Sequence, residues 1–211
     1  MSYNNIRDKG FRNIVDGLTT SLKKLNVEFN RIDGGAGDDS YQIAMYELCR
    51  NCTNLKDLNL GKNYTSDISG FALIKHAKSL TRLVFSHNGF SFERDEKGTK
   101  LFLQRVSECS KLAFLDLSYN VIGPALKEIA EVLPLCTNLT SLNLSEAEIE
   151  DPESEYLANV LPHSPHLKFL SLENNLLSPE AVQTLREKWA HADDDFKVDD
   201  QHDIYSEYGS D

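Results

Sequence analysis

Residues 112–120 read LAFLDLSYN, and this stretch decides the fold of the chain. Leucine stands at its first, fourth and sixth positions, and Asn120 stands at the ninth. Because successive side chains of a strand point to opposite faces, Leu115 and Leu117 share one face of a short strand. The amide of Asn120 can then bond backbone groups that a strand ladder leaves unpaired. The stretch therefore predicts a short strand that ends in a turn.

The same nine-residue pattern recurs along the chain. Its other copies begin at Leu22, Leu55, Leu80, Leu139 and Leu167. The copies at Leu55 and Leu167 are complete, whereas the copy at Leu139 has Ala147 in place of the asparagine. The first leucines are separated by 33, 25, 32, 27 and 28 residues. One such unit cannot bury its leucines alone, so neighbouring units stack and share a continuous core.

The segments between the copies are predicted to be helices. After Pro124, apolar residues recur at helical spacing up to Leu133. Residues 151–153 and 178–180 each combine a cap residue, a proline and an acid, which is typical of a helix start. Parallel strands need such crossovers. The sequence thus predicts an α/β solenoid in a horseshoe arc, with about six parallel strands on the concave face and helices on the convex face.

Repeats near 28 residues with a full helix and a Pro-then-Ala-Leu helix start resemble the ribonuclease-inhibitor class of leucine-rich-repeat proteins. The resemblance covers roughly residues 20–189. It implies a leucine-rich-repeat solenoid and a concave face that binds another protein. The class includes proteins of many different functions, because fold alone does not determine function.

We expect residues 1–189 to form a single leucine-rich-repeat domain. The terminal repeats of a solenoid expose apolar edges and need covers. Apolar residues at helical spacing predict an N-terminal capping helix within residues 1–19, and residues 178–189 are predicted to form the C-terminal capping helix. The charged stretch Ser91–Lys100 lies between a strand and its helix, so we expect an irregular loop there. The glycine-rich stretch Arg31–Asp39 is expected to be a second one.

Residues 190–211 form an acidic tail. The chain has a formal net charge of −11, and this tail, with eight acidic residues and one basic, contributes −7 of it. Such a balance argues against nucleic acid and anionic membranes as partners. One interpretation of the tail is a solvated terminus. The other is a docking strip for a basic surface, with apolar anchors at Phe196, Ile204, Tyr205 and Tyr208.

The four cysteines are interpreted as structural. Cys52, Cys109 and Cys136 each stand three residues before the first leucine of a repeat, a position that favours a small buried residue. A zinc site at the Cys49-Arg-Asn-Cys52 motif is disfavoured because such sites usually have four ligands. We expect no metal and no cofactor. Reduced thiols and the lack of an apolar N-terminal segment indicate a soluble, cytoplasmic protein.

The repeat pattern also predicts which side chains lie on the free face of the strands. These are the third, fifth, seventh and eighth positions of each unit. Aromatic residues and arginine are favoured at binding hot spots, and large apolar groups on a preformed surface indicate a binding site. The predicted partner-binding residues are Asp57, Asn59, Arg82, Val84, His87, Phe114, Asp116, Tyr119, Asn143, Glu146, Phe169 and Glu173.

The leading functional hypothesis is a non-enzymatic module that binds a partner protein and inhibits it by occlusion. No catalytic motif stands in a context that supports catalysis. We expect a monomer with no small-molecule substrate, no nucleic acid and no membrane among its partners.

There are three alternatives to this hypothesis. The Ran GTPase-activating protein family has the same repeat class followed by an acidic segment, although it has more repeats. The chain is also similar to bacterial effectors of the Gala-like leucine-rich-repeat type, which would place it in the cytoplasm of a host cell. Such proteins usually carry an N-terminal F-box, and residues 1–19 are too short for one. A third alternative, an adaptor of a ubiquitin ligase, is therefore disfavoured.

Overall fold

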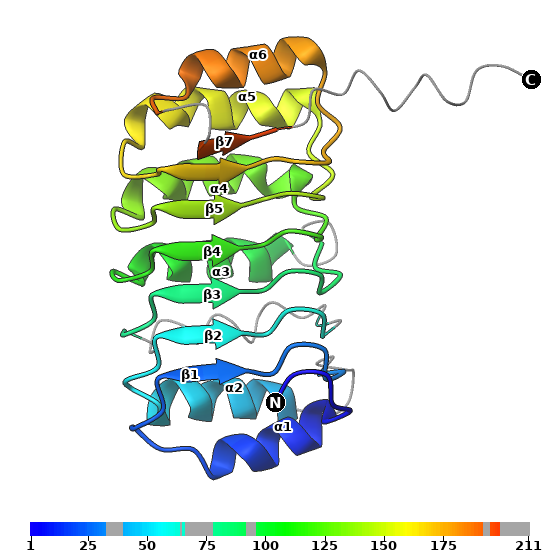
Figure 1. The fold of residues 1–211 in the computed structure, drawn as a ribbon, viewed down its shortest axis with the longest axis vertical. Helices are drawn as coiled ribbons and strands as arrows, with labels where there is room; N and C mark the ends of the chain where they lie inside the picture. Colours follow the sequence, from blue (N-terminus) through cyan, green and yellow to red (C-terminus); the bar gives the residue numbers. More distant parts are fainter. Residues whose placement is uncertain (33–39, 64, 66–77, 92–95, 192–194, 199–211) are drawn as a thin grey trace, which may run out of the picture.

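The chain forms a stack of strands covered on one side by helices (Figure 1). The computed structural model describes residues 1–32, 40–63, 65, 78–91, 96–191 and 195–198. Within these residues, seven parallel strands make one sheet whose order follows the chain, β1-β2-β3-β4-β5-β6-β7. The predicted α/β solenoid is therefore confirmed, with one strand more than expected.

Each strand is short and occupies the same place in its repeat. The strands are β1 (Lys24–Asn26), β2 (Asp57–Asn59), β3 (Arg82–Val84), β4 (Phe114–Asp116), β5 (Ser141–Asn143), β6 (Phe169–Ser171) and β7 (Phe196–Lys197). The fourth-position leucines lie in register, so that Leu58 pairs with Leu83 and Leu83 with Leu115. These leucines are buried between the sheet and the helices. The repeat pattern thus sets the register of the sheet.

Helices return the chain behind the sheet. They are α1 (Arg7–Asp16), α2 (Ser40–Asn51), α3 (Glu96–Glu108), α4 (Leu126–Val132), α5 (Asp151–Val160) and α6 (Pro179–Lys188). The three-residue 3-10 turns η2 (Gly123–Ala125), η3 (Leu133–Leu135) and η4 (Leu161–His163) flank α4 and α5. At the start of α6 the Ser178 hydroxyl accepts a hydrogen bond from Ala181 N at 3.2 Å, which confirms the predicted cap.

Two predictions about helix starts are wrong in detail. Asp151 was expected to cap α5, but it is the first residue of that helix, and its carboxylate accepts a hydrogen bond from Ser178 N at 2.8 Å in the next repeat. The stretch Ser91–Lys100 was expected to be irregular, but its last five residues begin α3. The i,i+4 ion pair between Lys100 and Glu96 supports that first turn.

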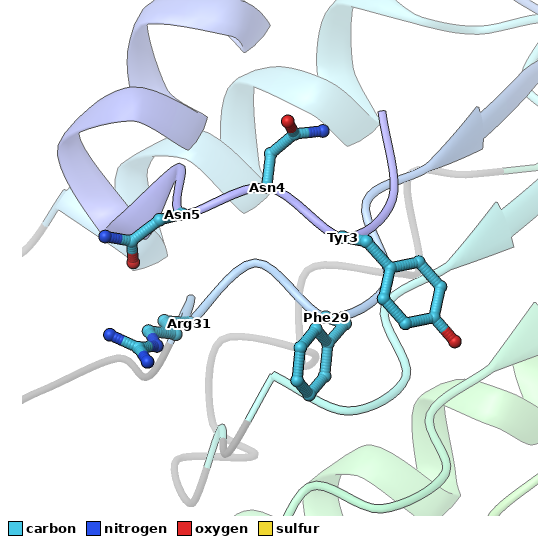
Figure 2. Close-up of a pocket in the computed structure, with 5 residues that line it drawn as sticks. All are labelled: Tyr3, Asn4, Asn5, Phe29 and Arg31. Carbon is cyan, nitrogen blue, oxygen red and sulfur yellow. The ribbon is translucent and has the colours of Figure 1, made fainter.

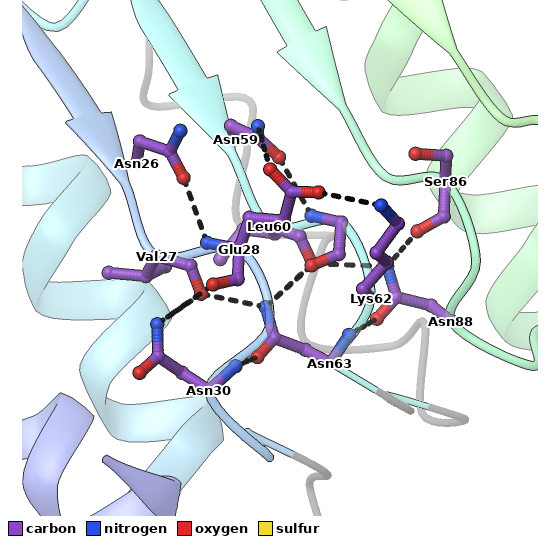
Figure 3. Close-up of polar contacts among 11 residues, drawn as sticks. Asn26, Val27, Glu28, Asn30, Asn59, Leu60, Lys62, Asn63, Ser86 and Asn88 are labelled. Atoms are coloured by element: carbon purple, nitrogen blue, oxygen red, sulfur yellow. Dashed lines mark hydrogen bonds and ion pairs between the residues drawn. The ribbon is translucent and has the colours of Figure 1, made fainter. Parts of the chain in front are cut away.

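A ladder of asparagine side chains joins consecutive repeats (Figure 3). The Asn63 side chain accepts a hydrogen bond from Asn30 N at 2.8 Å through Oδ1. Its Nδ2 donates to Val27 O of the preceding repeat at 3.0 Å and to Leu60 O of its own repeat at 2.9 Å. Asn63 N in turn donates to Asn88 Oδ1 at 3.0 Å. The prediction that these amides bond otherwise unpaired backbone groups is confirmed.

The ladder continues to Asn120, whose Oδ1 accepts from Asn88 N at 3.0 Å, and changes at Ala147. Here the backbone replaces the missing amide. Ala147 O accepts hydrogen bonds from Ile122 N at 3.0 Å and Gly123 N at 2.9 Å. A side chain at Gly123 would meet Glu148 O at 2.2 Å, so only glycine permits this approach.

Both ends of the sheet are covered. At the N-terminal end Tyr3 N donates to Glu28 O at 2.9 Å, and Asn4 N donates to Asn30 Oδ1 at 3.1 Å. At the C-terminal end Phe196 pairs with Leu170 in β7, is only 3% exposed, and stacks on Trp189 with ring centroids 5.6 Å apart.

The β7 strand corrects one interpretation of the acidic tail. Phe196 was considered as an anchor for a partner, but it is part of the core of this chain. The other three proposed anchors, Ile204, Tyr205 and Tyr208, lie outside the described residues.

The asparagine ladder should contribute strongly to stability. We expect Asn120→Ala to lower the free energy of unfolding by about 2–4 kcal/mol, because it leaves buried backbone donors and acceptors without partners. Urea denaturation followed by circular dichroism measures the change. The matched control is Asn138→Ala, which removes one exposed bond to Ser110 O and should cost less than about 1 kcal/mol. Equal losses for both variants would contradict the role of the ladder.

The cysteines should be inert while the chain is folded. All four are buried and none forms a disulfide, and burial raises the pKa of Cys49 and Cys109 to about 12 and that of Cys136 to about 11. Because the thiolate is the reactive form, we expect no reaction with a thiol-specific dye at pH 8 until urea unfolds the chain.

The same pKa shifts predict a loss of stability in alkali. The unfolded thiols lose their protons near the ordinary pKa of 9.0, and the folded ones do not until about 11 to 12. The unfolded state therefore binds fewer protons in this interval, and the free energy of unfolding should fall as the pH rises through it. Replacing Cys49 and Cys109 by alanine should make this part of the pH profile flatter.

Candidate protein-binding face

The face of the sheet that the helices leave uncovered is called the open face below (Figure 1). The third and fifth residues of each repeat point to it, because the leucines at the fourth and sixth positions point to the core. The third positions of four consecutive repeats lie in register as Lys24, Asp57, Arg82 and Phe114. The predicted site residues are therefore neighbours across strands as well as members of a repeat.

Arg82 lies at the centre of one group of predicted residues. Its Nη1 donates to Asp57 Oδ1 at 3.2 Å, and its guanidinium carbon lies 4.6 Å from the centre of the Phe114 ring. All three side chains are half-buried. An ion pair this exposed adds little stability, but together with the ring it holds the guanidinium in one place. The structure thus joins three predicted residues from β2, β3 and β4 into one cluster, here called the Arg82 cluster.

Side chains at the fifth positions accept hydrogen bonds from the turns that follow the strands. Asn59 Oδ1 accepts a hydrogen bond from Gly61 N at 2.9 Å. Asp116 Oδ1 accepts from Ser118 N at 3.1 Å and from the Ser118 hydroxyl at 2.7 Å. Asn143 Oδ1 receives the equivalent pair of bonds from its own turn, at 3.1 and 2.7 Å. These three predicted residues therefore keep the open face rigid and present half-buried polar groups on it.

Val84 was predicted to lie exposed on the open face as a partner contact, but the structure buries it. Its side chain is only 5% exposed. In the register of the sheet Val84 lies between Asn59 and Asp116. A short apolar side chain between longer polar ones on strands about 4.8 Å away is shielded from solvent. Val84 therefore contributes to packing. The sequence pattern identified the face of the sheet on which Val84 lies, but not that its side chain is buried there.

The eighth position of each repeat has a left-handed backbone. His87, Tyr119 and Glu146 have φ values of 57°, 57° and 53°. Residues other than glycine pay a cost in this region, but here the conformation recurs in every repeat and belongs to the turn. It directs His87 and Tyr119 toward each other, with ring centroids 5.1 Å apart, and Tyr119 is 50% exposed.

The remaining predicted residues lie toward the C-terminal end. The Phe169 ring is half-buried, with Lys197 Nζ 5.9 Å from its centre. Glu173 Oε2 accepts a hydrogen bond from the Ser171 hydroxyl at 3.1 Å, and Glu146 N donates to Glu173 O at 2.9 Å. This group is separate from the Arg82 cluster. Lys197 was not predicted to lie here, because a two-residue strand has no repeat signature.

An open pocket of about 220 Å³ lies at the N-terminal end, beside the first turn (Figure 2). It is lined by Tyr3, Asn4, Asn5, Phe29 and Arg31. The Tyr3 and Phe29 rings are 5.2 Å apart and both are exposed. Phe29 stands at the eighth position of the first repeat, so the pattern could have identified it, but nothing in the repeat identifies Tyr3.

Known proteins share this repeat architecture. The family described as Leucine Rich repeat matches residues 135–152. Tonsoku-like protein from Mus musculus is 26% identical over 195 residues, or 88% of this chain and 12% of that protein. NACHT, LRR and PYD domains-containing protein 4E from Mus musculus is 28% identical over 181 residues, or 81% of this chain and 17% of that protein. The chain thus spans less than a fifth of these curated relatives.

A solved structure agrees at the level of the fold. An internalin from Listeria monocytogenes superposes with a TM-score of 0.50 at 20% sequence identity, covering 86% of this chain and 50% of that one. Together with the register and the asparagine ladder, these comparisons show a leucine-rich-repeat protein. Such folds serve in general as protein-interaction modules. Among the described residues, no helix is long and apolar enough to cross a membrane.

Proposed function

We propose that this chain binds a partner protein on the open face of its sheet and inhibits that partner by covering its surface. The observation that carries the proposal is the Arg82 cluster, in which an arginine and an aromatic ring are held together on a rigid sheet. Arginine and aromatic side chains dominate the binding energy of protein interfaces. The proposal also places the chain in the cytoplasm as a monomer.

The rigidity of the open face supports this function. Binding is weakened by the entropy lost when side chains become ordered, and a surface that is already ordered loses less. Arg82 is held by Asp57 and by the Phe114 ring. Tyr119 packs against His87 and stands on a turn whose backbone is bonded to the next repeat through Ser145 O at 2.9 Å. These groups are therefore presented to a partner before it arrives.

The test is capture of a partner from a native lysate, followed by mass spectrometry and by measurement of affinity for the protein identified. We expect Phe114→Ala with Tyr119→Ala to weaken that affinity about tenfold or more, because two aromatic contacts are lost. The melting temperature should stay nearly unchanged. The matched control is Leu135→Ala with Tyr156→Ala, which removes exposed side chains from η3 and α5. Undiminished binding by the first variant would overturn the proposal.

Activation of a small GTPase is the second candidate, since the Ran activator family has the same repeat class and a following acidic segment. Adding the chain to a panel of small GTPases loaded with GTP distinguishes the two. We expect no rise in phosphate release above the intrinsic rate, with an established activator as the positive control. If adding the chain raises phosphate release, the proposed function would be activation of a GTPase instead of inhibition of a partner. The ubiquitin-ligase adaptor is tested by the same capture experiment, since it requires ligase subunits among the captured proteins.

A further inference from the structure

Basic side chains gather at the edge of the sheet where the first four strands begin. This group, called the basic row, consists of Lys23, Lys24, Lys56, Lys78, Arg82 and Lys111. The five lysines are exposed, and Arg82 is half-buried. Within the part of the chain that the structure describes, no ion pair is seen for these lysines, and the nearby acid Asp57 pairs with Arg82. A chain whose net charge is −11 thus has a positive edge.

Acidic side chains gather in another part of the sheet, where the strands β5 and β6 end. In the segments that follow β5 and β6, residues 144–151 and 172–178, every charged side chain is acidic. These are Glu146, Glu148, Glu150, Asp151 and Glu173. Basic side chains therefore gather where β1 to β4 begin, on the left in Figure 1, and acidic side chains gather where β5 and β6 end.

The backbone fixes the lysines next to one another. Lys56 N donates to Lys23 O at 2.8 Å, and Thr81 N donates to Lys56 O at 2.9 Å, so that the second residues of consecutive repeats stand in one column. Neighbouring strands lie about 4.8 Å apart. Like charges in adjacent positions across strands repel each other and are unfavourable in the free protein. An anion placed between Lys23 and Lys56 would relieve that repulsion.

We propose that the basic row receives an acidic segment of the partner protein, with an apolar or aromatic side chain of that segment seated against Phe114. This inference rests on the proposed function and names the chemistry of the partner. Lys24, Asp57, Arg82 and Phe114 follow one another in register across β1 to β4. The three steps between these strands span about 14 Å. About four or five residues of extended chain cover that distance.

A protein segment fits this surface better than a nucleic acid does. Double-stranded DNA carries one charge per about 1.7 Å and would extend beyond the row in both directions. It would then meet the field of a chain whose net charge is −11. A short acidic segment ends where the row ends, and its apolar side chain has a ring to contact at Phe114.

The probe is a short fluorescein-labelled peptide of alternating aspartate and glutamate that ends in phenylalanine, measured with the full chain by fluorescence anisotropy. The comparison peptide has asparagine and glutamine in place of the acids. We expect the acidic peptide to bind at least tenfold more tightly, and the difference to shrink as salt is raised. Lys23→Glu with Lys56→Glu should weaken acidic-peptide binding about tenfold or more.

The matched control is Lys127→Glu with Lys188→Glu, which makes the same change in net charge on the exposed surfaces of α4 and α6. We expect this variant to keep nearly all of its affinity for the acidic peptide. Equal losses for both variants would mean that only net charge matters and would overturn the inference. Equal binding of the two peptides, or tighter binding of a labelled single-stranded oligonucleotide, would also overturn it.

Failure of this inference can be told apart from failure of the proposed function. The Lys23→Glu, Lys56→Glu variant is tested against the captured partner beside the Phe114→Ala, Tyr119→Ala variant. Weaker binding by both supports the acidic segment. If only the aromatic variant loses the partner, the open face still binds protein and the basic row is not its contact. If neither loses it, both proposals fail.

Discussion

The buried asparagine amide that ends five of the six repeats is the interaction on which the rest of the structure depends. It supplies an acceptor and two donors in one side chain, and each is used: Asn63 bonds the backbone of the repeat before it and of its own. A turn buried between two repeats needs partners for its backbone groups, and the amide supplies them. The ladder therefore lets three-residue strands stack in register, although strands this short bring few ladder bonds of their own.

The departure at Ala147 shows that this requirement concerns hydrogen bonds rather than the asparagine itself. Where the amide is missing, Ala147 O accepts from two backbone donors, Ile122 N and Gly123 N. That geometry needs Gly123, whose position leaves no room for a Cβ beside Glu148. The absence of the asparagine side chain at position 147 is thus accompanied by the absence of any side chain at Gly123 in the preceding repeat. The repeat tolerates changes of residue as long as its buried donors and acceptors keep partners.

The parts of the fold that follow from periodicity could be predicted, and the parts that depend on single contacts could not. The strands, their register and the buried cysteines follow from the spacing of leucines. The β7 strand does not, because Phe196 is buried by its contact with Trp189 rather than by a repeat. Likewise the pattern places Val84 on the open face, but its neighbours Asn59 and Asp116 decide that it is covered. The Arg82 cluster was predicted residue by residue, whereas its cation–π contact depends on the register.

The separation of basic from acidic side chains makes the open face selective at short range for where an acidic partner binds. At physiological salt the field of an exposed charge is screened within about 8 Å, so an acidic partner feels little of the net charge of −11 until it is close. At contact the nearest charges dominate, and these differ from one edge to the other: lysines where β1 to β4 begin, acids where β5 and β6 end. An acidic segment placed where β5 and β6 end would meet Glu146 and Glu173 instead of Lys23 and Lys56. The charges therefore select the part of the open face that an acidic segment covers more than the speed with which it arrives.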